Sequence, residues 1–165
     1  GDKLLGSVQA GIIVGKKELI SKIKKNQLLR MLRVDKITLA LLEDNLMSYL
    51  KNELDSIPTL KMLHEKTNIL EKRALKLKNN IDDICTCEII HTQSLIGGGT
   101  TPNKKIPTVA LSIEYKDFKP NKIEKILREE NLITRIENEK VLIDFRSIQE
   151  HELEQIENII KRRFN

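Results

Sequence analysis

The order of sequence patterns over residues 84–164 constrains the fold more than any other feature. Four segments have the composition or the apolar alternation of β-strands, namely 84–93, 109–115, 132–137 and 140–145. In the second of them Val109, Leu111, Ile113 and Tyr115 alternate with small or polar residues, which is typical of a strand with one buried face. Asn138-Glu139 would form the turn of a hairpin between the last two strands.

Two helices fit between and after these strands. Pro120 suits a first helical position, and the residues of that helix that would face inward are Ile123, Ile126 and Leu127. Ser147 and Glu150 fit a capping box before a last helix, whose inward residues would be Leu153, Ile156, Ile160 and Phe164. The order strand, strand, helix, strand, strand, helix predicts a small α+β sandwich, with a sheet covered by helices on one face.

The first half of the chain has a different character. Ala10–Val14 is an apolar strand-like run closed by a glycine, and a short helix over Lys16–Lys25 and a short turn over Asn26–Leu32 follow. Asp35 is a good N-cap for a helix over Ile37–Lys51, which is apolar around much of its girth and is therefore expected to be buried.

A long helix is predicted after Pro58, which suits a first helical position. The apolar stripe of this helix recurs at spacings of three and four residues over about six turns and consists of Leu60, Leu63, Thr67, Leu70, Ala74 and Leu77. Asn79-Asn80 would end it, and such a helix often leads from one domain into the next. The later run Gly97–Gly99 is expected to form a flexible loop rather than a phosphate-binding loop, because no Lys-Ser/Thr follows it at the required spacing.

Composition and charge limit the partners. The 165 residues suffice for one domain or two small ones, and no apolar run approaches the roughly 18 residues of a transmembrane helix. Residues 1–80 contain 16 Lys and Arg against 9 Asp and Glu, whereas 81–165 contain 13 against 15. The basic residues concentrate in 16–36, which would attract a polyanion; the alternative is an ordinary solvated helix face. Neither a membrane nor DNA is expected as a partner.

The two cysteines, Cys85 and Cys87, are separated by one residue in a predicted strand, so their side chains would point to the same face, but Cys-x-Cys is a poor disulfide loop. A metal site that includes His91 would lack a fourth ligand at any recognisable spacing. We therefore expect reduced thiols and a cytoplasmic location.

Three residues are candidates for chemistry. Lys3 lies beside Asp2 among small residues, a setting that suits a lysine bonded to a planar cofactor, although most such lysines are simply surface residues. Arg30 and Arg33 would share one face if their segment is helical, and their guanidinium groups could then bind an oxyanion. The alternative is that these arginines pair with acidic residues or cap helices.

Four segments together resemble one protein family: GDKLLGSVQAGIIVGKK, LLRMLRVDKITLALLE, GGGTTPNKKIPTVAL and VLIDFRSI. They are similar in order and spacing to bacterial selenocysteine synthases, the L-seryl-tRNA(Sec) selenium transferases. The resemblance implies that Lys3 binds pyridoxal phosphate and that Arg30 and Arg33 bind the selenium donor, selenophosphate. Here Ser7 and Val8 replace the family's Gly-Pro, which changes the loop that follows the lysine.

The resemblance also implies an architecture. Members are fold-type-I pyridoxal-phosphate enzymes of α/β class and homo-oligomers that act on selenocysteine tRNA, and their large domain precedes the lysine. This chain is accordingly expected to be a C-terminal fragment that is inactive by itself. Its parts would be the end of the large domain (1–55), a connecting helix (56–80) and a small α+β domain (81–165).

In the implied reaction the seryl amine displaces Lys3, the freed lysine takes the α-proton, and selenium replaces the β-hydroxyl; Asp2 is expected to orient the lysine. Two other functions stay open. One is a pyridoxal-phosphate lyase acting on a free amino acid, whose carboxylate Arg128, Arg135 or Arg146 could bind. The other is a non-catalytic RNA-binding or assembly module.

Overall fold

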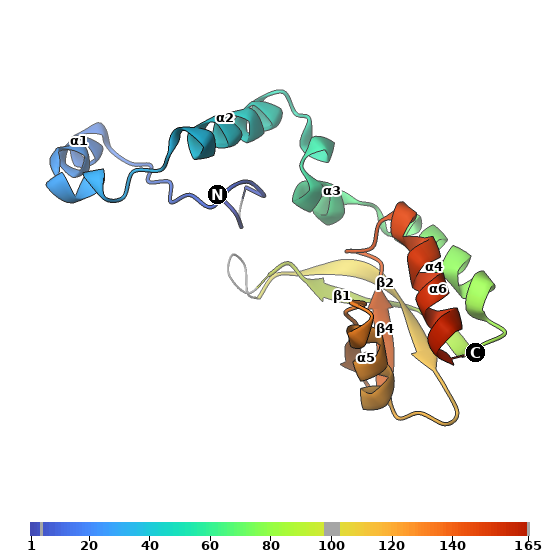
Figure 1. The fold of residues 1–165 in the computed structure, drawn as a ribbon. Coiled ribbons are helices and arrows are strands. Elements are labelled where there is room, and N and C mark those ends of the chain that lie inside the picture. The colour runs from blue at the N-terminus through green and yellow to red at the C-terminus, as the bar shows by residue number, and fades with distance from the viewer. Residues whose placement is uncertain (4, 98–102, 165) are drawn as a thin grey trace. The chain divides into compact units, whose positions relative to one another are not determined.

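The computed structural model describes residues 1–3, 5–97 and 103–164, in two compact units, Gly1–Lys61 and Met62–Asn165 (Figure 1). Within these ranges no helix is both long enough and apolar enough to cross a membrane. The predicted glycine-rich loop falls mostly on residues 98–102, outside the described part.

The second unit is an α+β fold built on a four-stranded antiparallel sheet of order β1-β2-β4-β3. Its elements in chain order are α4 (Thr67–Ile81), β1 (Thr86–Leu95), β2 (Lys105–Glu114), α5 (Pro120–Glu129), β3 (Arg135–Glu137), β4 (Lys140–Asp144) and α6 (Leu153–Phe164). The predicted order of strands and helices over 84–164 is therefore confirmed, including the opening of α5 at Pro120.

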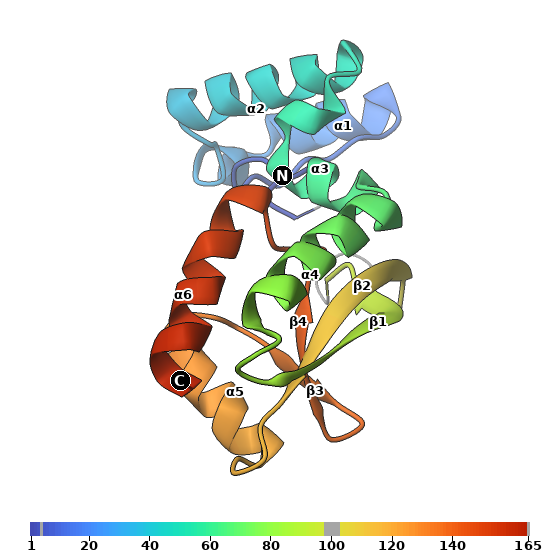
Figure 2. The same cartoon turned by 90° about the vertical axis from the view of Figure 1, so that its right-hand side faces the viewer.

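One hydrophobic core joins the sheet to its helices. Strand β2 contributes Val109, Leu111 and Ile113, which are fully buried on one face. The helices α4, α5 and α6 contribute to this same core, with fully buried residues such as Leu70, Leu127 and Ile160. All three helices thus cover the same face of the sheet (Figure 2).

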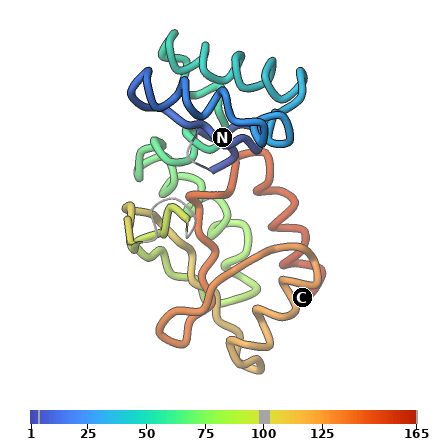
Figure 3. The backbone as a smooth tube through the Cα atoms, turned by 90° about the vertical axis from the view of Figure 1, so that its left-hand side faces the viewer, coloured from blue at the N-terminus to red at the C-terminus, as the bar shows by residue number. Residues whose placement is uncertain are grey.

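The β3–β4 hairpin forms the edge of the sheet and turns at the predicted position (Figure 3). Asn138 and Glu139 have φ values of 50° and 61°. Two successive left-handed residues are the mark of a tight turn whose twist matches that of antiparallel strands. Asparagine tolerates this conformation well, so the local sequence explains the turn.

Two details of the second unit correct the sequence-based expectations. The capping box before α6 consists of Gln149 and Glu152, not of Ser147 and Glu150: the Gln149 backbone N–H donates to Glu152 Oε2 at 2.7 Å. Glu150 instead pairs with Lys76 at 2.6 Å, so its carboxylate is not available for a cap.

The single long helix predicted from Pro58 is also divided. The structure has α3 (Pro58–His64) and α4, with an interruption at Glu65 and Lys66. Glu65 forms a two-bond ion pair with the buried Arg73, at 2.8 Å for each bond. Its backbone carbonyl also accepts a hydrogen bond from Arg146 at 2.6 Å, which an intact helix would have used internally. The predicted stripe is retained on α4, where Leu70, Ala74 and Leu77 are buried.

The first unit contains helices and turns. These are α1 (Lys17–Lys25), a short 3₁₀ helix η1 (Gln27–Arg30), α2 (Lys36–Leu50), a second 3₁₀ turn η2 (Leu54–Ser56) and the start of α3. The predicted N-cap is confirmed, because Asp35 Oδ1 accepts hydrogen bonds from the backbone N–H groups of Ile37 and Thr38 at 2.8 and 2.9 Å.

Two predictions for this unit are wrong. Ala10–Val14 is irregular rather than a strand, and among the described residues of Gly1–Lys61 no strand is present to pair with it. The helix α2 has no buried residue, and Ile37 and Leu50 are 73% and 81% exposed. Apolar composition alone does not bury a helix, because burial also needs an opposing surface.

Candidate active site

The loop that carries Lys3 folds back on itself and is anchored to α2. The Gly1 nitrogen donates to the Ala10 carbonyl at 2.7 Å, and the Ser7 N–H donates to the Gly1 carbonyl at 3.1 Å. From α2 the Tyr49 hydroxyl donates to the Leu5 carbonyl at 3.1 Å. These bonds fix the backbone on both sides of the lysine, while Leu4 itself lies outside the described residues.

Gly6 provides the second anchor of this loop. Its φ of +62° is in the left-handed region, and a Cβ atom there would lie 3.0 Å from Ile57 Cγ2 and 3.1 Å from Thr59 Cβ. A side chain at this position would be strained in conformation and crowded in space. The glycine therefore lets the loop pack closely against the segment at the start of α3.

Lys3 presents its amine to solvent beside one acid. Its Nζ lies 2.9 Å from Asp2 Oδ2, and the two side chains are 60% and 39% exposed. The hydrogen bond from Lys3 lowers the pKa of the Asp2 carboxyl below its ordinary value, so that Asp2 stays a carboxylate. An accessible primary amine can condense with an aldehyde, so Lys3 fits the role of attachment point for pyridoxal phosphate.

The two candidate anion-binding arginines do not lie on one helix. Arg30 is the last residue of η1, and Arg33 lies in the irregular link between η1 and α2. The condition for a shared helical face is therefore not met, because the 3₁₀ turn ends before Arg33 is reached. Both side chains are exposed, and in the described part of the chain neither forms an ion pair with an acidic group. No hydrogen bond among these residues joins Lys3 to either arginine.

The arginines proposed for a lyase are occupied by contacts within the second unit. Arg128 pairs with Glu124 one helical turn away, and Arg135 pairs with Asp144 across the sheet. Arg146 is 8% exposed and donates to backbone carbonyls, among them those of Met62 and Glu65. These partners give each arginine a structural role.

The cysteines are free and buried, and their Sγ atoms lie 3.2 Å apart. Throughout the described ranges, no three His, Cys, Asp or Glu side chains are grouped as metal ligands would be. The side chain of His91 instead lies 3.6 Å from Glu71 Oε1 of α4.

Comparison with known proteins agrees with the motif at the start of the chain. The family model described as "SelA: L-seryl-tRNA selenium transferase" matches residues 1–149. The chain belongs to this family. Proteins named L-seryl-tRNA(Sec) selenium transferase are 67% identical to it over 164 residues in Aliarcobacter butzleri and 61% identical over 161 residues in Sulfurimonas denitrificans. A third from Nautilia profundicola is 51% identical over 160 residues.

These alignments cover 99%, 98% and 97% of the chain, but only 36%, 36% and 35% of the respective relatives. The chain thus spans about 36% of the length of these relatives. The three candidate site residues lie within the stretch that the family model matches, and their roles are proposals.

Sequence reasoning did not single out Tyr49 or Gly6, the two residues that hold the lysine loop. A tyrosine on an apolar helix gives no indication of which distant carbonyl it contacts. Gly6 lies within the family motif, and its positive φ could have been suspected from the glycine alone, but not its contact with Ile57 and Thr59.

Proposed function

We propose that this chain is part of an enzyme that converts seryl-tRNA(Sec) to selenocysteinyl-tRNA(Sec), with pyridoxal phosphate as cofactor and selenophosphate as selenium donor. The observation that supports this most is that the family match includes the segment of Lys3, whose exposed amine lies on a loop anchored by Tyr49 and Gly6. The tRNA, the donor and the cofactor follow from the family and not from a contact seen here.

Lys3 has two tasks in this proposal. Bound pyridoxal phosphate supplies an electron sink next to the seryl α-carbon. Lys3 Nζ would hold the cofactor, and the same amine, when free, would take the α-proton of the seryl group. Asp2, at 2.9 Å, keeps the lysine side chain oriented and balances its charge.

Arg30 and Arg33 would receive the selenophosphate. Both are solvent-exposed guanidinium groups without an acidic partner among the described residues, so binding an anion would not require breaking an ion pair. A guanidinium group can donate two parallel hydrogen bonds to phosphate oxygens. Because the backbone between them is not one continuous helix, their side chains are expected to approach the donor from different directions.

The first unit would complete its packing in the larger protein. Large apolar side chains along it are exposed, including Val14, Met31, Leu32, Ile37 and Leu50. Apolar exposure on this scale usually marks a surface that another chain segment or subunit covers. We propose that this unit is the end of a fold-type-I large domain in a cytoplasmic homo-oligomer, and that the 165-residue chain alone is inactive.

The decisive experiment replaces Lys3 in the full-length enzyme. We expect Lys3→Ala to abolish both selenium transfer to seryl-tRNA(Sec) and the visible absorbance of the bound cofactor. Lys125→Ala, which changes an exposed lysine in α5, is the matched control and should retain both. Normal transfer by the Lys3 variant would refute the assignment, and turnover of free serine, cysteine or cystathionine instead of seryl-tRNA(Sec) would favour a lyase.

A further inference from the structure

The two cysteines form a contact that the proposed transferase reaction does not use. Cys85 lies in the bend between α4 and β1, and Cys87 is the second residue of β1. Their Sγ atoms are 3.2 Å apart and share a hydrogen bond. Both residues are buried, with Cys85 7% and Cys87 8% exposed. The chain has only these two cysteines.

The backbone permits this pair to become a disulfide. Alternate residues of a strand point to the same side, and their Cα atoms are about 6.6–6.8 Å apart. That separation is at the upper limit of what a disulfide spans, roughly 4.4–6.8 Å. The bend at Cys85 lets the two sulfur atoms meet, and a ring closed across a single residue is strained and hence easily reduced again.

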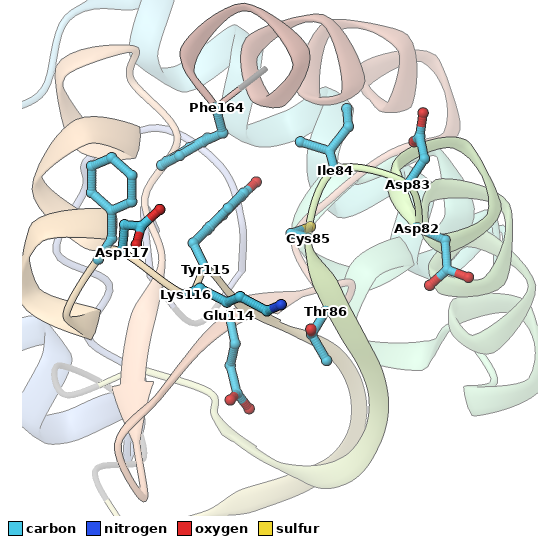
Figure 4. Close-up of a pocket in the computed structure, with 11 residues that line it drawn as sticks. Asp82, Asp83, Ile84, Cys85, Thr86, Glu114, Tyr115, Lys116, Asp117 and Phe164 are labelled. Atoms are coloured by element: carbon cyan, nitrogen blue, oxygen red, sulfur yellow. The ribbon is translucent and has the colours of Figure 1, made fainter.

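The surroundings distinguish the two thiols. Cys85 borders a cavity of about 390 Å³ whose lining also includes Tyr115, Phe118 and Phe164, whereas Cys87 does not line it (Figure 4). The hydroxyl of Tyr115 is buried, has no hydrogen-bond partner among the described residues, and points to the side of the cavity where Cys85 lies. A small polar oxidant entering this cavity therefore meets Cys85 first.

Electrostatics favours the same thiol. The hydrogen bond from Cys87 lowers the pKa of the Cys85 thiol, although burial and the nearby Asp82 and Asp83 oppose this. For Cys87 the contact with Cys85 acts in the other direction and, together with burial, raises the pKa of its thiol. Because the thiolate is the nucleophile, the lowered pKa favours Cys85 over Cys87 as the thiol that reacts first.

We infer that Cys85 and Cys87 are a reversible oxidation site, in which a peroxide oxidises Cys85 and Cys87 then resolves the product. The Cys85 thiolate displaces hydroxide from hydrogen peroxide and becomes a sulfenic acid. The Cys87 sulfur then attacks the Cys85 sulfur, the S–S bond forms, and the sulfenic oxygen leaves as water with the Cys87 proton. Hydrogen peroxide is the two-electron oxidant, and a dithiol reductant restores both thiols.

The test uses the 165-residue chain with hydrogen peroxide, followed by maleimide labelling and intact-mass measurement. We expect the wild type to lose two hydrogens, to form no disulfide-linked dimer and to take up no maleimide. A dithiol reductant should restore both labelling sites. In Cys87→Ser, dimedone should trap a sulfenic acid on Cys85. In Cys85→Ser, the remaining thiol should react at least about tenfold more slowly.

A control in urea tests whether the oxidation behaviour depends on the folded site or only on the closeness of the two cysteines in the sequence. The difference in rate between the two single variants should disappear when the chain is unfolded. Equal rates in the folded variants, or faster reaction of Cys87, would overturn the assignment of roles. Two independently oxidised cysteines, or disulfide-linked dimers in place of the internal bond, would overturn the site itself.

Discussion

At the scale of single residues, the arginines of this chain fall into two groups. Arg73 and Arg146 are buried and held by a carboxylate or by backbone carbonyls, and they stabilise the second unit. Arg30 and Arg33 are exposed and have no acidic partner among the described residues. A guanidinium group that has no partner within the fold can bind a ligand, and the ligand that we propose for these two is selenophosphate.

The arginine pair can be tested in the full-length enzyme. We expect Arg30→Ala or Arg33→Ala to remove a charge-assisted hydrogen bond worth roughly 1.5–3 kcal/mol, which is about 10- to 150-fold in transfer. The loss should fall on the use of selenophosphate, measured as the dependence of rate on donor concentration. Cofactor absorbance and seryl-tRNA binding should stay near normal.

Lysine at either position provides the control for this prediction. It restores the charge but not the two-donor geometry, so only part of the activity should return. Unfolding of either alanine variant, or an unchanged dependence on selenophosphate, would show that the arginines are structural and that the site is assigned wrongly.

At the scale of elements, the sheet is tied together by one acid. Asp144 of β4 accepts hydrogen bonds from Ser94 of β1 and Thr108 of β2, and it pairs with Arg135 of β3. Its carboxylate also accepts the backbone N–H of Arg146 at 3.0 Å. One side chain thereby links all four strands, which is why its ionisation bears on the stability of the sheet.

The pH dependence of stability should report on this acid. Burial alone would raise the pKa of Asp144, but the hydrogen bonds from Ser94 and Thr108 outweigh it and hold the pKa below the ordinary value. The folded protein then keeps the carboxylate ionised at a pH where the unfolded chain already binds a proton. The resulting stability is complete above about pH 4 and is lost as the pH falls further.

We expect Asp144→Asn to lower the free energy of unfolding at pH 7 by about 1–3 kcal/mol, because it leaves buried donors poorly satisfied. Urea unfolding between pH 7 and pH 3 should show a weaker acid dependence for this variant than for the wild type. Asp117→Asn, which changes an acid without an ion pair among the described residues, is the matched control. An identical acid dependence in wild type and Asp144→Asn would contradict the prediction.

The elements also show where sequence reasoning succeeded and where it failed. The strands and helices of 84–164 were predictable because alternation, turn residues and Pro120 all indicate the same fold. The break between α3 and α4 at Glu65 could not be predicted, because the apolar stripe in the sequence continues across it. Its partners, Arg73 and Arg146, lie 8 and 81 residues away, and such contacts leave no local pattern.

The candidate site was predictable in a different sense. The motif around Lys3 identifies the lysine, but the bond from Tyr49 and the packing of Gly6 depend on tertiary structure. The strand expected at Ala10–Val14 failed for a related reason, since a strand is stabilised by its neighbours and not by its own composition.

At the scale of the whole molecule, basic and acidic residues are unevenly distributed along the chain. Residues 1–80 carry seven more basic than acidic groups, and 81–165 carry two more acidic than basic groups. The basic residues of 16–36 include Lys22, Lys24 and Lys25 in the last turn of α1, all of them exposed. Such basic side chains favour contact with the phosphates of a nucleic acid, and contacts to phosphates do not distinguish one base sequence from another.

We therefore expect the 165-residue chain to bind tRNA weakly, with strong salt dependence and little preference among tRNAs, as measured by fluorescence anisotropy. Each phosphate contact that is lost should reduce the slope of log affinity against log salt by about 0.7–0.9. The double variant Lys24→Glu/Lys25→Glu should lower this slope, whereas Lys72→Glu/Lys125→Glu, at exposed positions of α4 and α5, should change it little. Tight binding at about 150 mM salt that is selective for selenocysteine tRNA would instead place tRNA recognition in this part of the enzyme.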